Sequence, residues 1–367
     1  MNNLTKTLEM PVKTYNYGVD ILRMLAMVLV VTVHATTFNG FTSQKADDIT
    51  TFFVAMSRYF SYICVPLFIM LSGFLCRTKK ISLRWYLKIF KIVAEYVVCS
   101  LVIMAFRKHY FGQEFTPVAV IESILNFSMA PYSWYINMYI GLFLLIPFLN
   151  VLYNNIPDQN KKRLLLAASI VIFSVPQTFR RLAWGYWNIG YPLMYYFIGA
   201  YINEYRPKIN KLAALAIIVA TLAFEAEILM TSPAYINVES HNNLFCLIVT
   251  TMTFSLLCDL TAKRKNSACR ALRTLANTSM SFFLLSYMFD QHLKAVFLTD
   301  KGITAFFDML PHLCYIVPLT VVASIAFGFV THYSVSMIYS LAEKTASAIA
   351  KRIESIHRKR LSDIAET

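Results

Sequence analysis

Apolar stretches long enough to cross a bilayer recur along the whole chain, and they constrain its fold more than any other feature. A hydrocarbon core of about 30 Å requires roughly 20 predominantly apolar residues in helical form. Ten stretches approach or reach that length, at 19–38, 57–76, 86–106, 133–152, 163–179, 187–205, 212–230, 243–260, 277–298 and 313–341. We therefore predict an all-α, polytopic membrane protein with about ten transmembrane helices.

The composition agrees with this prediction, since 57% of the 367 residues are hydrophobic, 15% are charged and the mean hydropathy is +0.53. Such a chain leaves little room for a separate soluble domain. We expect an N-terminal cytoplasmic segment at 1–18, a ten-helix membrane domain at 19–341 and a basic cytoplasmic tail at 342–367. The seven cysteines lack C-x-x-C spacing, so they are expected to be small core residues, and no metal site is expected.

Lysine and arginine are distributed unevenly between the two sets of loops. With the N-terminus inside, 25 of the 34 basic residues fall in cytoplasmic segments, whereas only six fall in outer loops. This bias predicts both termini in the cytoplasm, as in a multi-pass protein of the cell membrane. The net charge of +14 is then explained by loops beside anionic lipid, and no nucleic-acid partner is expected because no recognition module is visible.

The first span carries three ionisable residues, Asp20, Arg23 and His34. At about 100° per residue, Arg23 and His34 lie roughly 20° apart on the helical wheel, and Asp20 lies within about 60° of both. An ionisable group inside a bilayer is costly, so the stripe is a candidate functional site. A histidine can take a proton from a hydroxyl, and an arginine can bind phosphate or carboxylate. Alternatively, Arg23 snorkels to the headgroups and His34 bonds a neighbouring helix.

Three further segments carry recognisable patterns. The second span holds V-P-L-F-I-M-L-S-G-F-L at 65–75, S-W-Y precedes L-I-P-F-L within 133–149, and F-I-G-A-Y stands at 197–201. Together with the ionisable residues of the first span, they resemble the motifs of acyltransferase family 3, a family of membrane O-acyltransferases. Gly73, in the middle of the second span, is expected to permit the close approach of another helix.

The resemblance implies transfer of an acyl group, commonly acetyl, from cytoplasmic acyl-CoA to a hydroxyl at the outer side. His34 would be the general base, Arg23 would meet the CoA phosphates or hold the thioester end, and Asp20 would fix one of the two. Acyl-CoA, in the simplest case acetyl-CoA, would be a co-substrate and no cofactor would be permanently bound. In the ninth span, Phe283 and Ser286 stand where many family members have a tyrosine and a histidine, so no second histidine is carried over.

The resemblance also implies a carbohydrate acceptor, either a cell-surface polysaccharide or a lipid-linked glycan that would undergo O-acetylation. Trp134 and Tyr135 are candidates for a platform under a sugar ring, although both residue types also populate any membrane interface. Arg77, Lys80 and Arg84 are candidates for attracting the CoA phosphates. Positive charge on the cytoplasmic side would place these three residues there without any such role.

Two other classes of function remain open from the sequence. A ten-span protein with a polar stripe could be a transporter or flippase for a polysaccharide or lipid-linked sugar, but the broken helices expected in matching halves are not visible. It could also be a membrane sensor or scaffold, for which the sequence offers no partner domain. Turnover of acyl-CoA would distinguish the acyltransferase from both.

Overall fold

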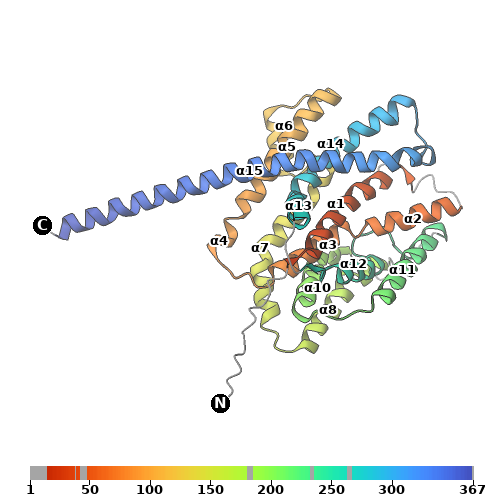
Figure 1. The fold of residues 1–367 in the computed structure, drawn as a ribbon, viewed down its shortest axis with the longest axis horizontal. Helices are drawn as coiled ribbons and strands as arrows, with labels where there is room; N and C mark the ends of the chain where they lie inside the picture. The colour runs from red at the N-terminus through yellow and green to blue at the C-terminus, as the bar shows by residue number, and fades with distance from the viewer. Residues whose placement is uncertain are drawn as a thin grey trace, which may run out of the picture.

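The computed structural model describes residues 15–37, 39–41, 48–179, 185–231, 235–262 and 267–365. Helices make up most of this part of the chain (Figure 1). In chain order they are α1 (Gly18–Thr37), α2 (Ile49–Ser61), α3 (Cys64–Cys76), α4 (Leu83–Tyr86), α5 (Ile89–Phe111), α6 (Pro117–Leu125), α7 (Trp134–Asn154), α8 (Gln159–Phe173), α9 (Val175–Thr178), α10 (Tyr191–Tyr205), α11 (Lys211–Thr231), α12 (Leu244–Leu257), α13 (Ser267–Ala276), α14 (Ser279–Phe297) and α15 (Phe306–Ala365). The 3₁₀ turns are η2 (Pro131–Ser133), η3 (Gly185–Gly190) and η4 (Thr299–Lys301), and the two-residue strands β1 (Tyr15–Asn16) and β2 (Thr261–Ala262) pair antiparallel.

Among the described residues, six helical segments are long and apolar enough to cross a membrane, judged by length and composition: Gly18–Thr37, Ile49–Cys76, Leu83–Phe111, Pro131–Asn154, Lys211–Thr231 and Phe306–Thr345. They coincide with six of the ten predicted spans. The other four coincide with helices α8, α10 and α12, which have 15, 15 and 14 residues, and with the more polar α14. Ten crossings and two cytoplasmic termini therefore stay predictions. Residues 1–14 of the expected N-terminal segment lie outside the described residues.

Local signals set the ends of several helices. At the start of α2, Asp48 accepts a hydrogen bond from the Thr51 amide at 2.7 Å, and this bond holds the pKa of Asp48 below its ordinary value. Asn243 caps α12 by accepting from the Cys246 amide, also at 2.7 Å. Helix α10 ends at Tyr205, because the next residue, Arg206, has a left-handed backbone with φ 42°. Because α2 and α12 both pack against α1, these caps help to place the helix with the ionisable stripe.

Two glycines bring α3 and α10 into backbone contact. A Cβ atom at Gly73 would lie 2.0 Å from the carbonyl oxygen of Tyr196, and one at Gly199 would lie 2.1 Å from that of Met70. No larger residue fits at either position without moving a backbone. The close approach predicted at Gly73 is thus confirmed, and its partner is the glycine of the 197–201 segment.

Helices α5, α14 and α15 meet at one buried carboxylate. Glu95 of α5 is 3% exposed, and it accepts a hydrogen bond from the Ser281 hydroxyl of α14. His332 of α15 places its Nδ1 at 3.0 and 3.1 Å from the two Glu95 oxygens. The carboxylate thus ties α5, α14 and α15 together.

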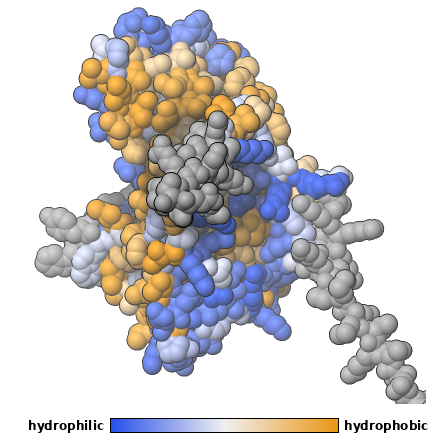
Figure 2. Space-filling model, turned by 90° about the vertical axis from the view of Figure 1, so that its left-hand side faces the viewer, coloured by the Kyte–Doolittle hydropathy of each residue, from blue (hydrophilic) through white to orange (hydrophobic). Residues whose placement is uncertain are grey.

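Helix α15 runs across the molecule and projects beyond it towards the C-terminus (Figure 1). It continues without a break past residue 341, where the predicted membrane domain ends, and beyond Thr345 the structure describes only its helical path. Figure 2 views the molecule along this projection. Hydrophilic residues gather on the lower half of the face that it shows, and hydrophobic residues dominate the upper half.

Four of the seven cysteines are buried, as expected for small core residues: Cys64, Cys99, Cys246 and Cys258. Within the described ranges, no three His, Cys, Asp or Glu side chains form a group that could hold a metal ion.

Candidate active site

The histidine of the first helix stacks on a tyrosine. His34 is half-buried near the C-terminal end of α1, and its ring lies on that of Tyr132, with centroids 3.8 Å apart and planes 6° apart. Tyr132 belongs to η2, the turn that leads into α7, and is 1% exposed. The stack joins α1 to the start of α7 and sets the orientation of the imidazole.

One face of α14 packs against the same tyrosine. The rings of Phe283 and Tyr287 lie 6.0 and 5.5 Å from the Tyr132 ring, between centroids. Steps of three and four residues place Asp290 and Lys294 on this face of the helix. They form a buried ion pair with Lys294 Nζ 2.7 Å from Asp290 Oδ2.

The two aromatic residues predicted to form a sugar platform face different surroundings. Trp134 is 40% exposed, and its ring stacks on that of His241 at 5.8 Å between centroids. Tyr135 is buried, and its ring lies 5.1 Å from that of Phe283. The Trp134 and Tyr135 rings are at 88° to each other, so Trp134 alone offers an accessible ring.

A buried arginine holds α2 against the end of α1. Arg58 donates hydrogen bonds to the hydroxyls of Thr36 at 3.2 Å and Thr37 at 3.1 Å. It also donates to the Tyr62 hydroxyl at 3.0 Å and pairs with Glu239 at 3.3 Å. Thr36 and Thr37 lie two and three residues after His34. Arg58 therefore holds the backbone of α1 close to the histidine.

A cavity of about 300 Å³, here called the Arg23 cavity, extends between α1, α3, α5, α7 and α14. Arg23, Ile92, Tyr135 and Phe283 are among the side chains that line it. Phe283 contacts the tyrosine on which His34 stacks. The cavity therefore extends from Arg23 to Phe283, a neighbour of the histidine stack.

Arg23 is held by two partners and still faces this cavity. Its Nη1 lies 3.6 Å from the Asp20 carboxylate and donates to Asn277 Oδ1 at 3.4 Å, and its side chain remains 25% exposed. Asp20 is buried and accepts a hydrogen bond from the Tyr15 hydroxyl. Burial and this carboxylate raise the pKa of Tyr15 to about 12. The structure thus joins Asp20 to Arg23, whereas His34 lies eleven residues further along α1.

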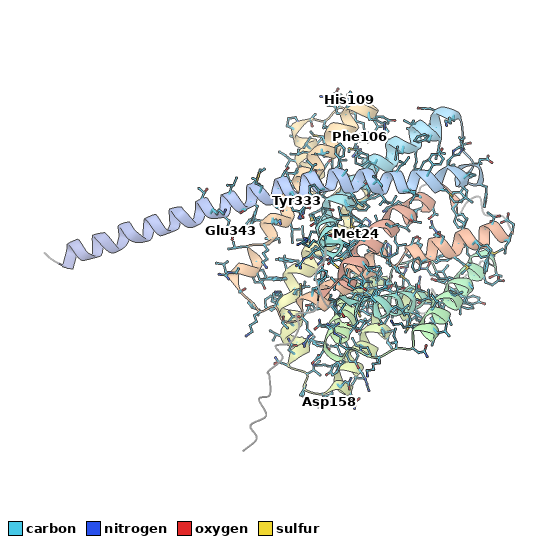
Figure 3. The ribbon with its side chains drawn as sticks, in the orientation of Figure 1. Met24, Phe106, His109, Asp158, Tyr333 and Glu343 are labelled. Carbon is cyan, nitrogen blue, oxygen red and sulfur yellow. The ribbon has the colours of Figure 1, made fainter. Side chains whose placement is uncertain are left out.

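A second cavity of about 1150 Å³, here called the Arg84 cavity, lies between α4, α5 and α15. Three basic side chains line it, those of Arg84, Lys88 and Lys91. On the α15 side it is bordered by Glu343, which Figure 3 labels where that helix leaves the body. Ile92 lines both cavities, so they adjoin at this residue.

The other two basic residues predicted to attract an anionic donor lie elsewhere. Arg77 donates to Asn203 at 3.3 Å and to Asn154 at 3.5 Å, and it pairs with Glu204 at 3.6 Å. These contacts tie the end of α3 to α7 and α10. Lys80 is exposed and lines neither the Arg23 cavity nor the Arg84 cavity.

Three residues near the histidine were missed by the sequence reasoning, namely Tyr132, His241 and Arg58. Tyr132 stands two residues before the tryptophan of the S-W-Y pattern, and that adjacency was the available signal. Arg58 is a charged residue in an apolar span, which is itself a mark of function. Nothing in the local sequence distinguishes His241.

The fold and the site define an integral-membrane protein in which a histidine stacks on a buried tyrosine, and a neighbour of that tyrosine lines a cavity with an arginine. The profile of the acyltransferase domain Acyl_transf_3 matches residues 16–329, which include every motif described above. The chain therefore belongs to acyltransferase family 3. Comparisons with curated proteins and with solved structures find no match.

Proposed function

We propose that this chain is a multi-pass O-acyltransferase of the cell membrane. It would move an acyl group, in the simplest case acetyl, from cytoplasmic acyl-CoA to a hydroxyl of a cell-surface or lipid-linked carbohydrate. The observation that carries the proposal is the Arg23 cavity, which extends from a partly exposed arginine to Phe283, a ring neighbour of the tyrosine on which His34 stacks. Membership of an acyltransferase family supplies the class of reaction.

The proposed orientation places the Gly18 end of α1 on the cytoplasmic side. It rests on the 25 of 34 basic residues that fall in the loops of that side. His34 then lies about 16 Å deeper than Arg23, towards the outer face. This order suits an anionic donor that arrives from the cytoplasm and an acceptor that arrives from outside.

The donor would lie across both cavities. The phosphates of CoA fit the Arg84 cavity, where Arg84, Lys88 and Lys91 supply positive charge. The thioester arm would pass Ile92 into the Arg23 cavity, where the planar fork of Arg23 can donate two hydrogen bonds to it. Its thioester end would extend from there towards His34. Asp20, 3.6 Å from Arg23, orients that fork.

In this reaction His34 takes the proton of the acceptor hydroxyl as general base. The oxygen attacks the thioester carbonyl, a carbon–oxygen bond forms and the carbon–sulfur bond breaks. The proton passes from the imidazolium to the departing thiolate, so the products are the ester and free CoA. Trp134, exposed beside His241, offers a ring face for a sugar.

The direct test is release of CoA thiol by the purified protein, supplied with acetyl-CoA and a glycan acceptor in lipid vesicles. Acceptor-dependent release that is lost in His34→Ala supports the proposal. A transporter or flippase would move the sugar across the vesicle without releasing thiol. Comparing glycan acylation in cells with and without the gene then identifies the acceptor.

A further inference from the structure

The buried ion pair of α14 differs from an ordinary pair within a helix. Asp290 and Lys294 have side chains that are 3% and 10% exposed, respectively. Burying two charges carries a desolvation penalty that the pair's own attraction does not reliably offset. Apolar residues would fill the same space at lower cost, so the position calls for another explanation.

The pair also leaves hydrogen-bonding capacity unused. Asp290 Oδ2 accepts from Lys294 at 2.7 Å and from Gln291 at 3.5 Å, whereas its buried Oδ1 has no partner among the described residues. An ammonium carries three donors, and the one hydrogen bond of Lys294 in the described ranges goes to Asp290. An unmet buried acceptor is destabilising by itself.

The pair lies on the face of α14 that packs against the candidate active site. It shares a face of α14 with Phe283 and Tyr287, whose rings contact Tyr132. Arg23 meets the cavity near the start of α1, while the ion pair lies near the end of α14, beyond the histidine stack. It is therefore on the acceptor side of the proposed reaction.

We propose that Asp290 and Lys294 bind the acceptor through hydroxyls next to the one that is acylated. Asp290 Oδ1 would accept from one hydroxyl, and the Lys294 ammonium would donate to the oxygen of its neighbour. This arrangement selects an acceptor with adjacent hydroxyls, as in a sugar ring, over an alcohol with a single hydroxyl. The inference rests on the proposed function, and it adds two specificity-determining residues and the substrate feature that they read.

The test combines a change in the protein with a change in the acceptor. The double variant Asp290→Leu, Lys294→Met removes both charges together, which avoids an uncompensated buried charge and keeps the fold. The acceptors are a panel of methyl hexosides and their monodeoxy analogues, with octanol as the single-hydroxyl alcohol. Release of CoA thiol from acetyl-CoA gives kcat/KM for each.

The wild type should prefer the hexoside to the analogue lacking the neighbouring hydroxyl by roughly ten- to a hundredfold, since hydrogen bonds to charged groups are involved. The double variant should lose this preference while its binding of acetyl-CoA is unchanged. Glu225→Gln is the matched control, because Glu225 of α11 is 1% exposed and its Oε2 also lacks a partner in the described ranges. It should keep the preference.

A preference that survives in the double variant would show that the pair is only structural. Octanol acylated as well as the hexosides would contradict the need for adjacent hydroxyls, while leaving acyl transfer intact. Absence of thiol release with every acceptor would instead contradict the proposed function.

Discussion

The imidazole of His34 and the ring of Tyr132 lie face to face, 3.8 Å apart and within 6° of parallel. Stacking uses the face of the imidazole, whereas proton transfer uses the nitrogens at its edge. The stack can therefore fix the direction of those nitrogens without using either of them for a hydrogen bond. Because Tyr132 is held by α14 on another side, the position of the base depends on three separate elements.

His34→Ala should abolish acyl transfer and leave the protein inserted and folded. A general base contributes roughly 10² to 10⁴ in rate, and the half-buried side chain is a small part of the core. Thiol release, measured beside binding of acetyl-CoA, checks this. Near-normal turnover by a well-expressed variant would remove His34 from the mechanism.

Tyr132→Ala should lower kcat by about tenfold to a hundredfold, because a base displaced by about 1 Å loses that much. Tyr132→Phe retains the ring and is the matched control, which should turn over nearly as fast as the wild type. KM for acetyl-CoA should be the same in both variants. A Phe variant as slow as the Ala variant would mean that the hydroxyl, and not the stack, is what matters.

Arg23→Lys should bind acetyl-CoA roughly tenfold more weakly although it keeps the charge, because lysine cannot reproduce the bidentate fork. His34→Ala should bind it about as well as the wild type. Burying the charged phosphates of CoA in the apolar region around the histidine would carry a large desolvation cost. Equal loss of affinity in both variants, or none in Arg23→Lys, would overturn this division of roles.

Gly73→Ala should destabilise the protein by roughly 1 to 3 kcal/mol, since the added methyl meets backbone and not a movable side chain. Gly141→Ala is the matched control, because nothing lies within 4 Å of a Cβ there, and alanine favours a helix by up to about 1 kcal/mol. Thermal unfolding in detergent compares the two. Equal unfolding temperatures would contradict the close contact.

Single cysteines at positions 80 and 113 should report opposite sides of the membrane. After replacement of the native cysteines, Gln113→Cys should react with an impermeant maleimide on intact cells, and Lys80→Cys only after lysis. Both native side chains are exposed, so access to each side is comparable. Labelling of position 80 from outside would invert the topology and the roles derived from it.

The sequence predicts the helical fold well, because the length of an apolar stretch limits what it can form. It predicts helix ends less well. The stretch at 187–205 yields a helix only from Tyr191, with Pro192 in its first turn, and the helix stops where Arg206 adopts φ 42°. Such ends depend on single backbone conformations, which mean hydropathy does not register.

The candidate site, too, could be predicted only in part from the sequence. Periodicity along one helix is enough to bring Asp20 and Arg23 together, and the structure gives 3.6 Å between them. Tyr132 reaches His34 from a position about 100 residues away in the chain, and Phe283 and Tyr287 of α14 contact Tyr132 from about 150 residues further on. Those neighbours follow from how α7 and α14 pack, and no local pattern encodes that packing.

The backbone contact between α3 and α10 also limits how the protein can accommodate a donor. A side chain can change its rotamer to admit a ligand. At Gly73 and Gly199, however, α3 and α10 meet through their backbones, and there is no side chain that could move. Helix α3, which forms one wall of the Arg23 cavity, is therefore a stationary wall. A cavity that widens during turnover would open more easily at Asn277, between α13 and α14, which lines it and accepts a single hydrogen bond from Arg23. Spectroscopic distances between α3 and this turn would detect such a widening when the donor binds.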